Sequence, residues 1–236
     1  MNKVEVCFSP LSYALYERKD AIVVVVDILR ATSAICTAFQ YGVASITPVA
    51  SIDEALVYQK HGFIVAAERK GEVVEGFSMG NSPFSFMNPE LKDKNIVLTT
   101  TNGTQAINVA KNAYKLLIGS FLNLQALTDR LLEENKDVVI LCSGWKDRFN
   151  IEDTLFAGAL AEALIKSGNF EAGCDSAIAA VHLFILADGD LEEFLENSSH
   201  RKRLNHLGLE EDVKFCLSMN KMTVIPQLMD GKLVIV

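Results

Sequence analysis

The chain has 236 residues, of which 50% are hydrophobic and 22% are charged, a composition typical of a globular protein rather than a disordered one. Acidic residues outnumber basic residues by 30 to 22, and the net charge of -8 disfavours a nucleic-acid-binding surface, which needs clustered Lys and Arg. The longest apolar run, residues 21–26, is too short to cross a membrane, and the N-terminus does not resemble a signal peptide. We therefore expect a cytoplasmic protein that binds neither membranes nor nucleic acid, with its five cysteines reduced.

Four segments repeat one pattern, in which a buried strand is followed by a polar loop and then often by a helix. Strands are predicted over residues 21–28, 62–67, 95–99 and 137–142, and helices over 34–40, 105–112 and 152–166. Continuous apolar strands alternating with helices predict an α/β protein, with a mainly parallel sheet covered by helices on both faces. Ligands of such sheets bind beyond the carboxyl ends of the strands. We therefore expect the four polar loops to form the site together.

The last fifty residues follow a different pattern. Charged amphipathic helices are predicted over 191–197 and 209–220, followed by two strands and a turn within 223–236. No linker rich in Pro or Ser separates this part from the rest. We predict a single domain over residues 1–236, with a smaller C-terminal α+β portion as an alternative second lobe from about residue 188.

Asp27 ends the most apolar predicted strand. A carboxylate is costly to bury there unless it is paired or bound to a cation. Perturbed carboxylates at strand ends are common in active sites, so Asp27 is interpreted as a metal-binding or catalytic residue. The alternative is a structural Asp, bonded to backbone amides or to Arg30.

Two loops that lead into predicted helices are candidate anion sites. Arg30, Thr32 and Ser33 follow the first strand, where free helix amides and a planar guanidinium group suit phosphate or sulfonate. The loop after the third strand contributes Thr100, Thr101, Asn102, Gly103 and Thr104. Ordinary helix caps and a tight turn are the alternative interpretations of these loops.

Glu68 and Arg69 end the second predicted strand. Glu68 is suited to complete a magnesium site with Asp27, because Mg²⁺ prefers a few carboxylates together with water and phosphate oxygens. Arg69 is a candidate for a second anionic group. The alternative is an ion-pair cluster on the surface.

The loop after the fourth strand and the helix that follows it complete the candidate set. Ser143 and Gly144 follow the strand, and Glu152 and Asp153 open the helix. Asp153 is a candidate metal ligand, although acidic residues also favour helix N-termini without binding anything. The basic run 201–203 is interpreted mostly as a solvated face, and most of the four histidines as structural.

Taken in order, these motifs resemble the 2-phosphosulfolactate phosphatase family. The resemblance covers nearly the whole chain and rests on residues 26–33, 68–71, 80–83, 99–104, 142–144, 152–153, 207–216 and 224–226. It implies an α/β fold and a magnesium-dependent phosphatase that converts 2-phospho-3-sulfolactate to 3-sulfolactate and phosphate. In methanogens this reaction is a step toward coenzyme M.

The resemblance and the chemistry of the residues together suggest roles for the site. Asp27, Arg30 and Glu68 are expected to be catalytic, and Asp27 with Glu68 or Asp153 is expected to hold Mg²⁺. The first strand lacks the second aspartate of the DxD phosphatase signature, so the nucleophile stays open.

Other residues are expected to contact the sulfonate and carboxylate of this small, highly anionic substrate. The candidates are Arg69, Asn81, Ser82 and Ser143, with Gly144 beside them. Two alternatives are a phosphatase for another small phosphorylated carboxylic acid and a non-catalytic anion-binding domain. A homodimer is compatible with the hydrophobic composition.

Overall fold

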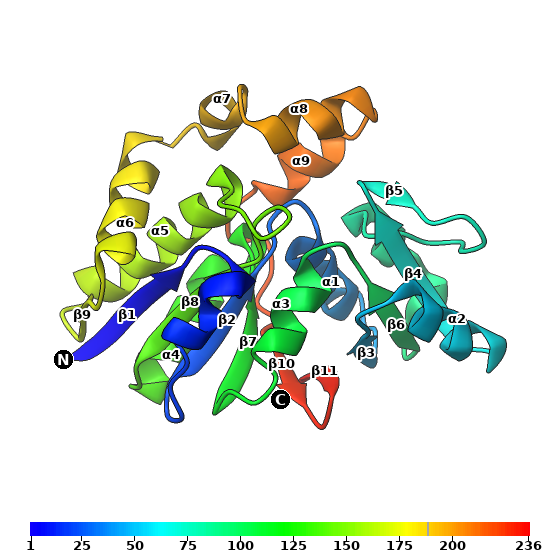
Figure 1. The fold of residues 1–236 in the computed structure, drawn as a ribbon, viewed down its shortest axis with the longest axis horizontal. Coiled ribbons are helices and arrows are strands. Elements are labelled where there is room, and N and C mark those ends of the chain that lie inside the picture. The colour runs from blue at the N-terminus through cyan, green and yellow to red at the C-terminus, as the bar shows by residue number, and fades with distance from the viewer. Residues whose placement is uncertain (188) are drawn as a thin grey trace.

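The computed structural model describes residues 1–187 and 189–236. The alternative second lobe would begin at Asp188, which lies outside the described residues, so this boundary stays a prediction. The predicted α/β class is confirmed, because one large, mostly parallel sheet carries helices along its length (Figure 1).

The strands form a mixed sheet in the order β5-β4-β6-β3-β11-β10-β7-β2-β8-β1-β9. Six neighbouring pairs are parallel and four are antiparallel. The strands are β1 (Asn2–Cys7), β2 (Ile22–Val26), β3 (Ser45–Pro48), β4 (Ile64–Arg69), β5 (Glu72–Val73), β6 (Asn95–Thr99), β7 (Lys115–Gly119), β8 (Val138–Cys142), β9 (Phe170–Ala172), β10 (Pro226–Met229) and β11 (Lys232–Ile235).

Helices connect most of these strands and also form the region above the carboxyl ends of β2 and β8 (Figure 1). The α-helices are α1 (Ala31–Gln40), α2 (Ile52–Lys60), α3 (Gly103–Val109), α4 (Leu124–Glu134), α5 (Ile151–Lys166), α6 (Asp175–Leu186), α7 (Leu191–Leu195), α8 (Ser199–His206) and α9 (Glu210–Cys216). Short 3-10 helices are η1 (Pro10–Leu15), η2 (Pro83–Met87), η3 (Pro89–Leu91) and η4 (Phe121–Asn123).

The elements predicted from the sequence are present, with small shifts at their ends. The four predicted strands are β2, β4, β6 and β8, and the predicted closing strands are β10 and β11. The predicted helices correspond to α1, α3, α5, α7 and α9. Of these, α1, α3 and α5 begin one to three residues earlier than expected, whereas α9 is shorter than expected.

Strand β2 pairs in parallel with β7 and β8 and is buried on both faces. Ile22, Val24 and Val26 belong to a core cluster that includes side chains of α4, α5 and α6. Val23 and Val25 point the opposite way, into a second cluster that includes side chains of α1 and α3. Because successive side chains of a strand alternate between its faces, an unbroken apolar run is what such a strand requires.

The antiparallel hairpin β10–β11 lies within the sheet, between two groups of parallel strands (Figure 1). Gln227 of β10 pairs with Leu117 of β7, and Leu233 of β11 pairs with Ile46 of β3. The hairpin therefore joins the group β4-β6-β3 to the group β7-β2-β8-β1-β9.

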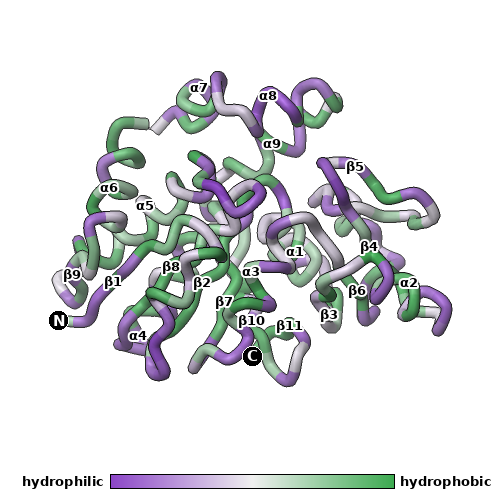
Figure 2. The backbone as a smooth tube through the Cα atoms, viewed as in Figure 1, coloured by the Kyte–Doolittle hydropathy of each residue, from purple (hydrophilic) through white to green (hydrophobic). Residues whose placement is uncertain are grey.

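The hydropathy of the chain follows this layered arrangement. Figure 2 shows hydrophobic residues along the central strands, whereas α8 is coloured mainly hydrophilic. Within residues 1–187 and 189–236, no helix combines the length and the apolar character that a membrane span requires.

Candidate active site

The loops that follow β2, β4, β6 and β8 meet at one edge of the sheet, as predicted. Most of them line a small cavity of about 10 Å³, which is close to the space that a single water molecule needs. The residues around it are Asp27, Leu29, Arg30, Glu68, Gly71, Asn81, Thr101, Asn102, Trp145, His200 and Leu204. We call the part made by Trp145 and α8 the roof, and the part made by the other strand-end residues the floor.

Asp27 lies in the floor, at the point where β2 ends and α1 is about to begin. Its amide donates to Thr32 Oγ1 at 3.1 Å, and the Thr32 amide donates to the Asp27 carbonyl at 2.9 Å. Helix α3 also begins here, and a Cβ added to Gly103 would lie only 2.9 Å from Asp27 Oδ2. The carboxylate therefore lies next to the N-terminal ends of two helices.

The Asp27 carboxylate is 7% exposed, and its surroundings disfavour its negative charge. Burial raises its pKa from 3.8 to about 8, and the nearby carboxylates of Asp153 and Glu68 act in the same direction. His200 and the Ala31 amide act in the opposite direction. Among the described residues no side chain donates a hydrogen bond to this carboxylate. A buried carboxylate with so few partners is suited to bind a cation or to exchange a proton.

Glu68 faces the same cavity but has many hydrogen-bond partners. Its Oε1 accepts from the Gly71 amide at 2.7 Å, and its Oε2 accepts from the Thr101 amide at 3.0 Å. The Thr101 hydroxyl lies 3.1 and 3.2 Å from the two carboxylate oxygens. Glu68 therefore ties the turn after β4 to the loop after β6, and this tie fixes its orientation toward the cavity.

Arg30 lines the cavity, but its guanidinium group already has partners within the protein. It forms a buried ion pair with Asp212 of α9 at 2.6 Å and donates to the Gly71 carbonyl at 2.6 Å. The Ser82 hydroxyl donates to the other Asp212 oxygen at 3.2 Å. The sequence alternative in which Arg30 pairs with Asp27 is not what the structure shows.

Arg69 does not line the cavity. It donates to the Glu68 carbonyl at 2.6 Å and to the Thr99 hydroxyl at 3.0 Å. Burial lowers the pKa of its guanidinium group, while the Glu68 carboxylate opposes that shift. Its surroundings are those of a residue that stabilises the ends of β4 and β6.

The hydroxyl residues of the two anion-site candidates make local bonds. Ser33 donates to the Ile28 carbonyl at 2.9 Å. Thr104 donates to the Thr100 carbonyl at 3.1 Å, and its amide donates to the Thr100 hydroxyl at 3.1 Å. The Thr100 and Thr104 contacts match the alternative interpretation of a tight turn, whereas the N-cap residues of α1 and α3, Arg30 and Asn102, make no side-chain capping hydrogen bond.

Asp153 is fully buried and does not line the cavity. Its Oδ1 accepts from the Ile28 amide at 2.9 Å, and its Oδ2 accepts from the Gly144 amide and from Asn150, each at 3.0 Å. Burial raises its pKa, and the neighbouring Glu152 adds to that shift. Asp153 therefore ties the loop after β2 to the loop after β8.

Asn81 and Ser143 each have a buried side-chain oxygen without a hydrogen-bond partner in the described part of the chain. Asn81 is 5% exposed and lines the cavity, as well as an adjoining hollow of about 300 Å³. Arg30 and Gly71 also line both spaces. An unpartnered polar atom at this position is free to bond to a ligand.

The predicted metal ligands are only partly brought together. Asp27 and Glu68 line one cavity, whereas the Asp153 oxygens are occupied by backbone and side-chain donors. In the part of the chain that the structure describes, no group of three or more His, Cys, Asp or Glu side chains could hold a metal ion. Magnesium binding stays a prediction that rests on Asp27 and Glu68.

The roof of the cavity was not predicted. His200 of α8 lies in it, and its Nδ1 is 2.5 Å from Oε1 of the buried Glu152. The Trp145 ring lies beside the His200 ring, with centroids 5.4 Å apart. The lone tryptophan in the polar loop after a predicted strand is a sequence signal that was not used.

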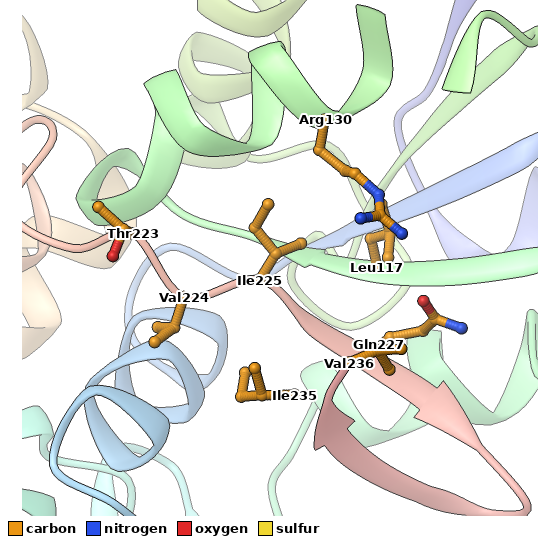
Figure 3. Close-up of a pocket in the computed structure, with 8 residues that line it drawn as sticks. All are labelled: Leu117, Arg130, Thr223, Val224, Ile225, Gln227, Ile235 and Val236. Carbon is orange, nitrogen blue, oxygen red and sulfur yellow. The ribbon is translucent and has the colours of Figure 1, made fainter. Parts of the chain in front are cut away.

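A second hollow, of about 260 Å³, lies beside the hairpin β10–β11 (Figure 3). Its lining is mostly apolar, with Arg130 and Gln227 as its long polar side chains. Arg130 is paired with Glu134 of the same helix at 2.9 Å. None of the predicted site residues lines this hollow, so it does not compete with the strand-end cavity as the candidate active site.

Comparison with known proteins gives a consistent result. A family model described as 2-phosphosulpholactate phosphatase matches residues 7–231. A probable 2-phosphosulfolactate phosphatase of Carboxydothermus hydrogenoformans is 39% identical over 237 residues, which cover 99% of this chain and 97% of the relative. Proteins of the same description from Thermotoga maritima and Caldanaerobacter subterraneus are 39% and 37% identical, over 88% and 90% of this chain and 89% and 90% of the relatives.

Proposed function

This chain belongs to the 2-phosphosulfolactate phosphatase family of phosphoric monoester hydrolases, and we propose that it converts 2-phospho-3-sulfolactate to 3-sulfolactate and phosphate with the help of Mg²⁺. The observation that carries this proposal is the position of Asp27. It is a buried carboxylate that faces a small cavity beside Glu68, next to the start of two helices.

The residues around Asp27 fit a magnesium ion. Asp27 lacks a side-chain donor in the described residues, and Glu68 faces the same space with its orientation fixed. Mg²⁺ is usually held by one or two carboxylates together with water and phosphate oxygens, which is the number of carboxylates found here. When bound, the ion would neutralise charge on the phosphate.

The remaining contribution of the chain is to bind and orient the phosphate. The N-terminal end of α1 lies just beyond Asp27, where the helix dipole favours a negative group. Thr101 and Asn102 line the cavity from the opposite loop. In the reaction the ester P–O bond breaks, water supplies the new oxygen on phosphorus, and the sulfolactate oxygen gains a proton. Asp27 is placed to orient the attacking group.

The test is phosphate release from 2-phospho-3-sulfolactate, measured with added Mg²⁺ and with EDTA. We expect release to need the metal, and Asp27→Asn to lower the rate by at least about 100-fold, within the range for a residue that acts directly in proton transfer or charge stabilisation. Asp129→Asn is the matched control, because Asp129 is exposed on α4.

Other outcomes would point to the alternatives. Faster release from 2-phosphoglycerate would identify a phosphatase for another small phosphorylated acid. If a folded protein released no phosphate from any such acid with added Mg²⁺, the anion-binding domain would be the better account.

A further inference from the structure

Helix α8 places a polar, basic segment against the acidic floor. Its sequence is Ser-His-Arg-Lys-Arg-Leu-Asn-His, and His200 and Leu204 on it line the cavity. Arg203 follows His200 by three residues, so it lies on the same side of the helix. The basic run of the sequence therefore forms part of the roof, and not only a solvated face.

Most of the arginines near the cavity have partners. Arg30 is paired with Asp212, and Arg69 donates to the Glu68 carbonyl and to Thr99. Arg201 lies 4.0 Å from Glu192. Arg201 Nη1 is also buried without a hydrogen-bond partner, but it is Arg203 whose guanidinium group stacks on Trp145, a residue that lines the cavity.

Arg203 has no ion pair among the described residues, and its Nη2 is buried without a hydrogen-bond partner. Burial lowers the pKa of its guanidinium group, and the charge of Glu152 acts in the opposite direction. A buried N–H without an acceptor costs free energy that an anionic ligand would recover. The Arg203 guanidinium group therefore has a buried N–H that lacks an acceptor among the described residues.

Trp145 connects Arg203 to the cavity. The Arg203 Cζ atom lies 4.0 Å from the centroid of the Trp145 ring, and Trp145 itself lines the cavity with Asp27. Lys146 Nζ is 5.7 Å from the same centroid. Stacking on an aromatic ring keeps a guanidinium group oriented while its N–H groups stay available at the edge.

We propose that Arg203, stacked on Trp145, binds the sulfonate of the substrate while the phosphate lies at Asp27. This inference rests on the proposed function. A substrate with several negative groups cannot place them all against a floor that contains Asp27 and Glu68, so the group remote from phosphorus needs a separate cation. The planar guanidinium group suits an anion whose charge is shared among several oxygens.

The first experiment compares Arg203→Gln with Lys202→Gln, which removes the same charge from an exposed neighbour on the same helix. For 2-phospho-3-sulfolactate we expect Arg203→Gln to raise KM about 10–100-fold, which corresponds to the loss of a charge-assisted hydrogen bond, with kcat changed less than about threefold. For 2-phospholactate, which lacks the sulfonate, KM should stay within about twofold of wild type. Lys202→Gln should resemble wild type with both substrates.

The second experiment measures binding without catalysis. Trp145 is the one tryptophan of the chain, so its fluorescence reports on this site alone. Titration with 3-sulfolactate should change the emission in a saturable way, and Arg203→Gln should weaken binding at least about 10-fold, whereas Lys202→Gln should not. If Arg203→Gln fails to fold by circular dichroism, Arg203→Lys keeps the charge, loses the planar fork and should give an intermediate loss.

The outcomes separate this inference from the proposed function. Wild-type hydrolysis with unchanged KM and 3-sulfolactate binding in Arg203→Gln would overturn the sulfonate site and leave the function intact. An equal rise in KM for both substrates, or an equal effect of Lys202→Gln, would also overturn it. Binding of 3-sulfolactate that depends on Arg203, without any hydrolysis, would support the site and contradict the phosphatase proposal.

Discussion

The floor and the roof of the cavity hold their polar groups in different ways. Glu68 in the floor, and Asp153 outside the cavity, accept hydrogen bonds from backbone amides of neighbouring loops, so their orientations are set by the sheet. In the roof, the buried Arg203 Nη2 has no partner among the described residues. Groups whose bonds are satisfied within the protein preserve its shape, whereas groups without partners are free for a ligand. We therefore expect variants of Glu68 and Asp153 to alter stability and variants of Arg203 to alter recognition.

The largest expected effect on stability is at Asp153. Asp153→Ala would leave the buried amides of Ile28 and Gly144 without acceptors, at a cost of about 1–3 kcal/mol each. We expect the free energy of unfolding to fall by about 2–6 kcal/mol, measured by urea denaturation. Asp153→Asn keeps one acceptor oxygen and should lose less.

This pair of variants also tests the alternative role of Asp153. If Asp153 were a metal ligand that contributes little to the stability of the fold, its variants would lose activity rather than stability. In that case Asp153→Asn would keep its stability and lose metal-dependent activity, and the description of Asp153 as a tie between loops would be wrong.

A smaller effect is expected at Gly103, where α3 packs against α1. An added Cβ would lie 2.6 Å from Ala31 Cβ and 2.9 Å from Asp27 Oδ2, so the two helices would have to separate. Gly103→Ala should cost about 1–3 kcal/mol of stability, the usual range for overpacking, and activity should fall because Asp27 is displaced. Thermal unfolding and phosphate release measure the two effects, and wild-type values for both would show that the floor tolerates movement.

A further predicted effect is a gain in stability on removing the Asp27 charge. The folded pKa of Asp27 is about 8 and its ordinary value is 3.8, so the folded state retains a proton that the unfolded state has lost between these pH values. The stability that the folded state gains by holding the Asp27 proton is present at pH 4 and is lost as the pH rises toward 8. Asp27→Asn carries no charge and should not show this loss.

The measurement is thermal unfolding of metal-free protein in EDTA at pH 4 and pH 8.5. At pH 8.5 the Tm of Asp27→Asn should exceed that of wild type by at least about 2–4 °C, the shift expected for 1 kcal/mol in a chain of this size. At pH 4 the two proteins should differ little. A lower Tm for Asp27→Asn at pH 8.5 would mean that the Asp27 carboxylate stabilises the floor after all.

Much of the floor could be predicted from the sequence because its signals are local. The Val-rich run before Asp27 predicted a strand buried on both faces, and the position of Asp27 at its end predicted a constrained carboxylate. The pairing of Arg30 with Asp212 was not predicted, because these residues are 182 positions apart. Contacts over such separations leave no mark on local periodicity.

The roof could not be predicted for the same reason. His200 reaches the cavity, and Arg203 stacks on the cavity-lining Trp145, only because α8 lies over loops that come much earlier in the chain. The interpretation of residues 201–203 as mostly solvated was wrong in part, since the Arg201 side chain is 13% exposed and Arg203 is stacked on Trp145. A cytoplasmic location, a homodimer and a role in coenzyme M synthesis stay predictions.

The position of the β10–β11 hairpin sets the order in which the sheet can be completed on the ribosome. β7 ends at Gly119 and the hairpin begins at Pro226, about a hundred residues later. At 5–20 residues per second, the facing edges of β3 and β7 stay unpaired for roughly 5–20 s of synthesis. Unpaired strand edges can pair with the wrong strands, so a nascent chain at this stage is prone to misfolding and aggregation.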